Sequence, residues 1–122
     1  MRATCWARWA TCALGISIWV PALADRARRS VAACTSFEQT DQGEARVAFA
    51  IRNACSMPVD CAVSWRVLCA PESKRRRRTH PGSVRLAVEP AASQRAEASA
   101  EVCGDDGWMI DSVEWRCEPS KL

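Results

Sequence analysis

Apolar residues alternate with polar residues along much of the chain. The alternation is clearest in four segments, 46–52, 61–69, 84–89 and 113–118. Successive side chains of a β-strand point to opposite faces of a sheet, so a two-residue period predicts a strand with one buried face. The apolar positions of these segments are therefore the expected core: Val47, Phe49, Ile51, Cys61, Val63, Trp65, Val67, Cys69, Val84, Leu86, Val88, Val113, Trp115 and Cys117.

Stretches rich in glycine, proline and aspartate separate these segments and predict turns, as at "HPG" (80–82) and "GDDG" (104–107). The segment 91–102 is ambiguous, because its alanines and glutamates favour a helix while its alternation favours a strand. We assign it as a strand because strands flank it. The pattern predicts an all-β fold, a small antiparallel β-sandwich. About six strands are expected, near 34–40, 44–54, 60–69, 83–89, 94–103 and 108–118.

The first 24 residues have the three-part form of a secretory signal peptide. Arg2 and Arg8 give a basic start, residues 9–20 are uncharged and mostly apolar, and Ala22 and Ala24 are the small residues that a signal peptidase reads. We expect cleavage after Ala24, a secreted or periplasmic protein, and membrane contact only through the cleaved signal peptide. An uncleaved anchor, or a lipid attached to a later cysteine, is the alternative. The remaining chain is interpreted as a flexible lead-in, 25–33, and one domain, 34–119.

Cysteine usage points to disulfides. Two of the eight cysteines lie in the predicted signal peptide, and an even number in a short exported chain is typical of a disulfide framework. The chain has no Cys-x-x-Cys and only one histidine, which disfavours a zinc or thioredoxin-type site. We therefore expect three disulfides, no metal and no cofactor. The six cysteines are Cys34, Cys55, Cys61, Cys69, Cys103 and Cys117.

Alternating strand directions constrain the disulfide pairing. Cys69 and Cys103 end strands at one pole of such a sandwich, and the other four cysteines lie at the opposite pole, so Cys69–Cys103 is favoured. Three pairings remain open for the other four. They are Cys34–Cys55 with Cys61–Cys117, Cys55–Cys61 with Cys34–Cys117, and Cys55–Cys117 with Cys34–Cys61.

Cys55, Trp65 and "DSVEWRC" (111–117) resemble the arrangement found in immunoglobulin domains. That family has a cysteine, a buried tryptophan about ten or more residues later, and Asp-x-x-x-aromatic-x-Cys before a last strand. Here the aromatic residue is tryptophan, and only "EPSKL" follows Cys117. The resemblance covers about 44–118 and implies an immunoglobulin-like sandwich, a fold that hosts many functions.

Charge is concentrated in one run. Of the 17 basic residues two lie in the predicted signal peptide, which leaves a charge near +1 against 14 acidic residues. Five basic residues are consecutive: Lys74, Arg75, Arg76, Arg77 and Arg78. Such a run stays solvated, which predicts an exposed loop that attracts a polyanion, and the net acidic remainder argues against a specific nucleic-acid role. A solvated loop without a function is the alternative interpretation.

No catalytic residue is expected. His80 lies in "RTHPG", a predicted exposed turn, and motifs for a nucleophile or a phosphate are lacking. Asp105 and Asp106 offer too few oxygens for calcium. Trp108 follows a glycine turn and is a candidate exposed contact for a sugar or a protein.

These features predict a non-catalytic binding or accessory module, a monomer, whose partner is an unknown protein or a polyanionic glycan. One alternative is a small secreted protease inhibitor that presents the 70–83 basic loop. Another is a structural component of the cell envelope.

Overall fold

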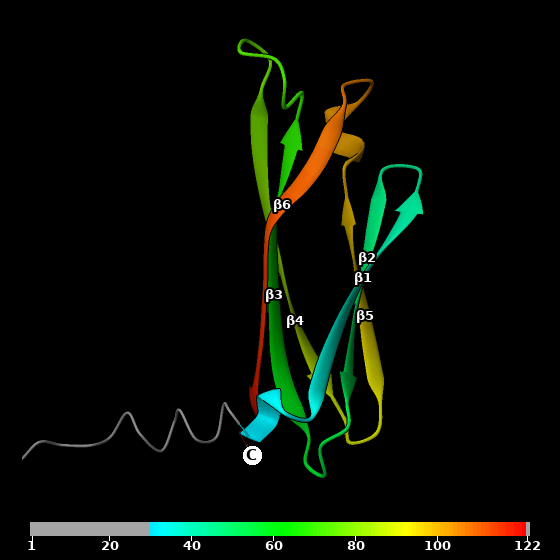
Figure 1. Ribbon diagram of the computed structural model, residues 1–122, viewed down its shortest axis with the longest axis vertical. Coiled ribbons are helices and arrows are strands. Elements are labelled where there is room, and N and C mark those ends of the chain that lie inside the picture. Colours follow the sequence, from blue (N-terminus) through cyan, green and yellow to red (C-terminus); the bar gives the residue numbers. More distant parts are fainter. Residues whose placement is uncertain (1–29, 122) are drawn as a thin grey trace, which may run out of the picture.

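The computed structural model describes residues 30–121; the predicted signal peptide and residues 25–29 of the predicted lead-in lie outside the described residues. Two three-stranded antiparallel sheets face each other and form two layers (Figure 1). The prediction of a small all-β sandwich is confirmed. Its elements are β1 (Thr35–Gly43), β2 (Arg46–Asn53), β3 (Val59–Cys69), β4 (Arg78–Val88), β5 (Ser93–Ser99), the 3₁₀ helix η1 (Glu101–Cys103) and β6 (Trp108–Pro119).

The strand order places four strands at sheet edges. One sheet has the order β1-β2-β5 and the other β4-β3-β6. β1–β2 and β3–β4 are hairpins within a sheet, whereas the chain changes sheet between β2 and β3, β4 and β5, and β5 and β6. β3 lies at the centre of its sheet, so it pairs along its length with both β4 and β6.

Aromatic rings join the two layers through the core. Phe37 and Phe49 belong to one sheet, and Trp65 and Trp115 to the other. The ring of Phe37 stacks on Phe49 at 5.7 Å and on Trp115 at 5.4 Å, and Phe49 lies 5.1 Å from Trp65. The four rings therefore form a continuous row across the sandwich, and such pairs contribute about 0.5–1.5 kcal/mol each beyond the area they bury. Trp65 and Trp115 pack against the core, as the alternation predicts.

β4 begins five residues earlier than expected, because the "HPG" segment is a strand and not a turn. His80 pairs with Val67 of β3, and Pro81 and Gly82 continue the ladder. Proline lacks an N–H and is tolerated at a sheet edge, which is where β4 lies. The interpretation of His80 as an exposed turn residue is wrong: its side chain is partly buried. The loop between β3 and β4 is correspondingly shorter, 70–77.

β5 ends at Ser99, before the expected boundary at 103. The backbone N–H of Ala100 donates to the carbonyl of Ala45 at 2.7 Å, and Glu101–Cys103 then form η1. The 3₁₀ turn brings Cys103 (3% exposed) toward the end of β3.

The last residues of the predicted flexible lead-in are ordered against the core. Ser30 to Ala32 are helical, and Val31 is only 1% exposed. The carbonyl of Val31 accepts hydrogen bonds from the backbone of Cys34 at 3.1 Å and from the hydroxyl of Thr35 at 2.9 Å. One buried valine in an otherwise polar and small-residue segment gives no periodic signal, so the sequence did not predict this contact.

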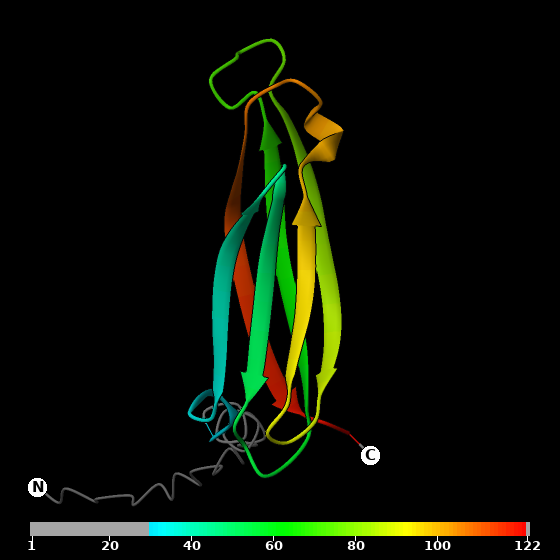
Figure 2. The ribbon, with the colours of Figure 1, turned by 90° about the vertical axis from the view of Figure 1, so that its right-hand side faces the viewer.

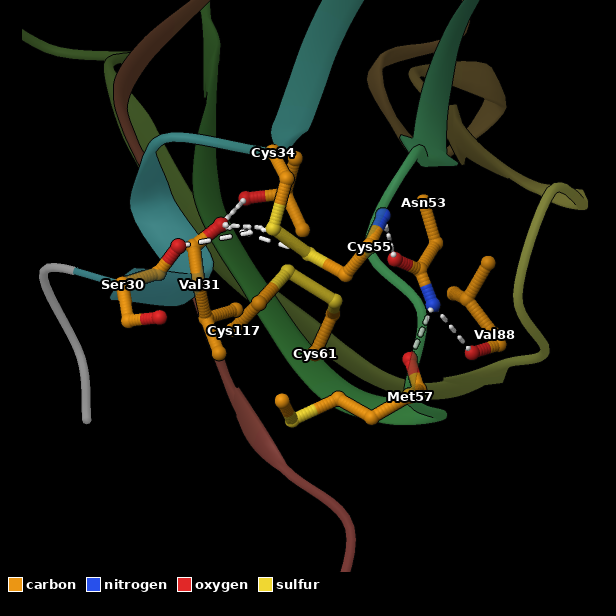
Figure 3. The surroundings of a disulfide bond; sticks show 10 residues. Ser30, Val31, Cys34, Asn53, Cys55, Met57, Cys61, Val88 and Cys117 are labelled. Carbon is orange, nitrogen blue, oxygen red and sulfur yellow. Dashed lines mark hydrogen bonds between the residues drawn. A yellow bond between two sulfur atoms is a disulfide. The ribbon is translucent and has the colours of Figure 1, made fainter.

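Three disulfides join the six cysteines: the favoured Cys69–Cys103 bond is confirmed, and the other four cysteines form one of the three pairings that the sequence left open. The disulfides are Cys34–Cys55, Cys61–Cys117 and Cys69–Cys103. The first two lie together at one pole of the core (Figure 3). Cys55 and Cys117, which the immunoglobulin arrangement would join, are bonded to other partners. Three disulfides indicate an oxidising environment, which a cytosolic chain does not usually meet.

Candidate functional site

The basic loop, defined as residues 70–77, lies at one end of the long axis of the molecule (Figure 2). The disulfides Cys34–Cys55 and Cys61–Cys117 lie at the opposite end. It connects β3 to β4 and extends beyond the hairpin of β1 and β2 (Figure 1). Lys74 to Arg77 belong to this loop, and Arg78 is the first residue of β4. All five basic side chains are exposed, four on the loop and Arg78 at the start of β4.

The base of the basic loop is fixed to the η1–β6 connection. Cys69 and Cys103 form a disulfide, and the backbone N–H of Ala70 donates to the carbonyl of Gly107 at 2.7 Å. Ala70 has a φ of +49°, which turns the chain sharply out of β3. A left-handed conformation is unfavourable for alanine, so the surrounding contacts must hold it.

Hydrogen bonds within the basic loop give it a defined course. The backbone N–H of Ser73 donates to the carbonyl of Ala70 at 3.0 Å. The hydroxyl of Ser73 then accepts from the backbone N–H of Arg76 at 3.0 Å. Two successive turns therefore bring Arg76 back over the η1–β6 connection.

Among the described residues 30–121, one of the five cations forms an ion pair. Nη1 of Arg76 lies 3.1 Å from Oδ1 of Asp106. The Arg76 side chain is 72% exposed and that of Asp106 22%, so the pair contributes about 1 kcal/mol at most. Lys74, Arg75, Arg77 and Arg78 form no ion pair among residues 30–121, so four cations at this pole remain available to an external anion.

Trp108 does not provide the exposed contact that its position after a glycine turn suggested. It is partly buried at the start of β6, pairs with Cys69 in the ladder, and packs against the core. The exposed apolar residues nearby are Val102 in η1, 52% exposed, and Met109 in β6, 44% exposed. Single apolar residues give no sequence signal of their exposure, because it depends on which face the local turn presents.

Two acidic residues near the loop, Asp106 and Asp111, are engaged in ion pairs. Asp106 holds Arg76, and Asp111 accepts two hydrogen bonds from Arg66, at 3.0 and 3.2 Å. Across the described part of the chain, no group of three or more His, Cys, Asp and Glu side chains is placed to hold a metal ion. His80 has its Nε2 buried without a hydrogen-bond partner in residues 30–121, on an apolar face of β4.

No protein-family model matches the chain, and neither a curated protein nor a solved structure matches it. The class of the protein is therefore defined by its own architecture: a small all-β domain with two three-stranded sheets and three disulfides. Within residues 30–121, no helix has the length and apolarity that a membrane span requires.

Proposed function

We propose that the protein is a non-catalytic binding module, secreted or periplasmic, that recognises a polyanionic surface through the basic loop. The observation that carries this proposal is the set of four cations without an ion pair in residues 30–121, three on the loop and one, Arg78, at the start of β4. The base of this loop is fixed by a disulfide and a backbone hydrogen bond. A fixed base limits the conformational entropy that the loop loses when it binds.

Binding of this kind is electrostatic and therefore depends on salt. At about 0.15 M ionic strength charges are screened over about 8 Å, so an anionic chain or surface must come close to the loop to be held. Because the rest of the mature chain is net acidic, the positive potential is local, and it orients the molecule with this pole toward the ligand.

A charge-matched comparison tests the proposal. Arg75, Arg77 and Arg78 are replaced by serine in one variant, and the exposed Arg52, Arg85 and Arg95 in the control. Both variants lose three positive charges. We expect the loop variant to leave immobilised heparin at lower salt than the control, and to lose binding to lipopolysaccharide. Equal elution of the two variants would show that only the net charge matters and would refute the loop site.

A protease inhibitor is the second candidate, favoured by the disulfide at the base of an arginine-rich loop. Arg76 is held by Asp106, so Arg75 and Arg77 are the side chains free to enter the specificity pocket of a trypsin-like protease. Titration of trypsin with the oxidised protein separates the two candidates. Stoichiometric inhibition that persists over hours supports the inhibitor function. Cleavage of the loop as an ordinary substrate would exclude that function.

A further inference from the structure

The outer edge of β6 carries two charged residues of opposite sign. Among the strands that the structure describes, β6 pairs only with β3 and lies at the edge of its sheet. On its outer face Asp111 is bonded to Arg66, whereas Glu114 and Arg116 have no ion-pair or hydrogen-bond partner within residues 30–121. These two residues are of opposite sign, lie two positions apart on the same face, and flank Trp115.

The inner face of the same strand segment is apolar. Trp115 and Val113 are only partly buried and pack against the core. The ring of Trp115 stacks on Phe37 of β1, the edge strand of the other sheet, so the two rings close this side of the sandwich. When another strand pairs with this edge, the apolar inner face can be buried further, and the charges of the outer face can form ion pairs with that strand.

We propose that this edge is a homodimer interface, in which β6 pairs antiparallel with β6 of a second copy about a two-fold axis at Trp115. This register places Glu114 opposite Arg116 of the other copy, twice by symmetry. A register centred on Glu114 or on Arg116 would place that residue opposite the same residue of the second copy, so that like charges would face each other. The bulge at Ser112, whose φ is +53°, limits the pairing to about 113–117.

The other edges fit a second copy less well. β4 contains Pro81, which cannot donate to a neighbouring strand, and the charged residues of β1 are both acidic. β5 carries Arg95 and Glu97 in a similar arrangement, but its inner row is Gln94, Ala96 and Ala98, which offers little apolar surface. The β5 pair therefore serves as a matched control.

Charge exchange tests the interface, and sedimentation equilibrium of the oxidised protein is the measurement. Glu114→Arg sets arginines against each other, and Arg116→Glu sets glutamates against each other. The dissociation constant of the dimer should therefore rise about tenfold or more in each variant. The double exchange should restore the dimer. An equimolar mixture of the two single variants should form a heterodimer, since Arg meets Glu at both positions.

The recovered complexes exclude misfolding as the cause of a loss, because a misfolded variant would not regain a partner. The control exchanges, Arg95→Glu and Glu97→Arg, should leave the dimer intact. A monomeric wild-type protein at about 0.1 mM, dissociation by the β5 exchanges, or a mixture that stays monomeric would each overturn the proposal. None of these outcomes depends on whether the basic loop binds a polyanion.

Discussion

The indole ring of Trp65 lies directly against the backbone of Gly82. The two residues are opposite each other in the β3–β4 ladder, and a Cβ added at Gly82 would overlap three atoms of the ring. Packing against Trp65 therefore requires a residue without a side chain at position 82. A glycine that looks like part of a turn in the sequence instead makes room for the indole ring of Trp65.

Replacement of Gly82 by alanine should destabilise the domain. The new methyl group must displace Trp65 from its place beside Phe49, and overpacking of this kind costs about 1–3 kcal/mol. Denaturant unfolding of the oxidised protein measures the loss. Gly107→Ala is the control, because no atom lies within 4 Å of its added Cβ, and its midpoint should stay close to that of the wild type. Equal effects would mean that Trp65 moves without cost.

Asn53 should be intolerant of change. It is 0% exposed, its amide nitrogen donates to the carbonyls of Met57 at 2.9 Å and Val88 at 3.0 Å, and its oxygen accepts from the N–H of Cys55 at 2.8 Å (Figure 3). Asn53→Leu removes all three hydrogen bonds, two of them buried, and we expect a loss of about 2–5 kcal/mol in unfolding free energy.

Asn53→Asp provides a pH signature for the same contacts. A buried carboxylate cannot donate to the two carbonyls, but a protonated carboxyl can donate to one. Burial raises its folded-state pKa above the unfolded value, so the variant should be least stable at neutral pH and regain stability, relative to wild type, as the pH falls. Parallel pH dependences for variant and wild type would contradict the assigned hydrogen bonds.

Asp106→Asn should strengthen polyanion binding. It removes one negative charge and also frees Arg76, which adds a fifth available cation to the loop. Asp105→Asn makes the same change in net charge at an exposed neighbour that has no ion pair among the described residues. On immobilised heparin the Asp106 variant should need more salt for elution than the Asp105 variant. Its unfolding free energy should change by about 1 kcal/mol at most, because the pair is exposed to water.

Loss of the disulfide at the loop base should loosen the loop more than its neighbours. Replacing Cys69 and Cys103 by serine costs about 2–4 kcal/mol and removes one of the links that fix Ala70 beside Gly107. Hydrogen exchange of the Ala70 amide should become faster under conditions where the domain remains folded. Replacement of Cys34 and Cys55, at the other pole, should leave that amide protected.

The period of two was enough to predict the strands and the buried rows of β2, β3 and β6, because a sheet with one dry face imposes that pattern on the sequence. The poles of the strands then favoured the Cys69–Cys103 disulfide and left three pairings open for the other four cysteines. The start of β4 was missed, since Pro81 and Gly82 read as a turn unless the edge position and the Trp65 contact are known. The burial of Val31 likewise depends on contacts distant in sequence.

For the candidate site, charge alone located the loop but not its internal arrangement. The pairing of Arg76 with Asp106 joins residues 30 positions apart, and only the fold brings them together. Trp108 looked exposed because a glycine turn precedes it, yet the strand that follows turns it toward the core. The sequence does not show that Glu114 and Arg116 lie on an edge strand, because the position of β6 in its sheet follows only from the fold.

The disulfide pattern decides what a cut in the basic loop would do. A bond broken between Lys74 and Arg78 divides the described chain into two fragments, and both Cys61–Cys117 and Cys69–Cys103 connect one fragment to the other. The central strand β3 would stay covalently linked to β6 and to η1. A nicked molecule would therefore remain one covalent species under non-reducing conditions, heavier only by the water added in hydrolysis, and would separate into two pieces only when a reductant is added.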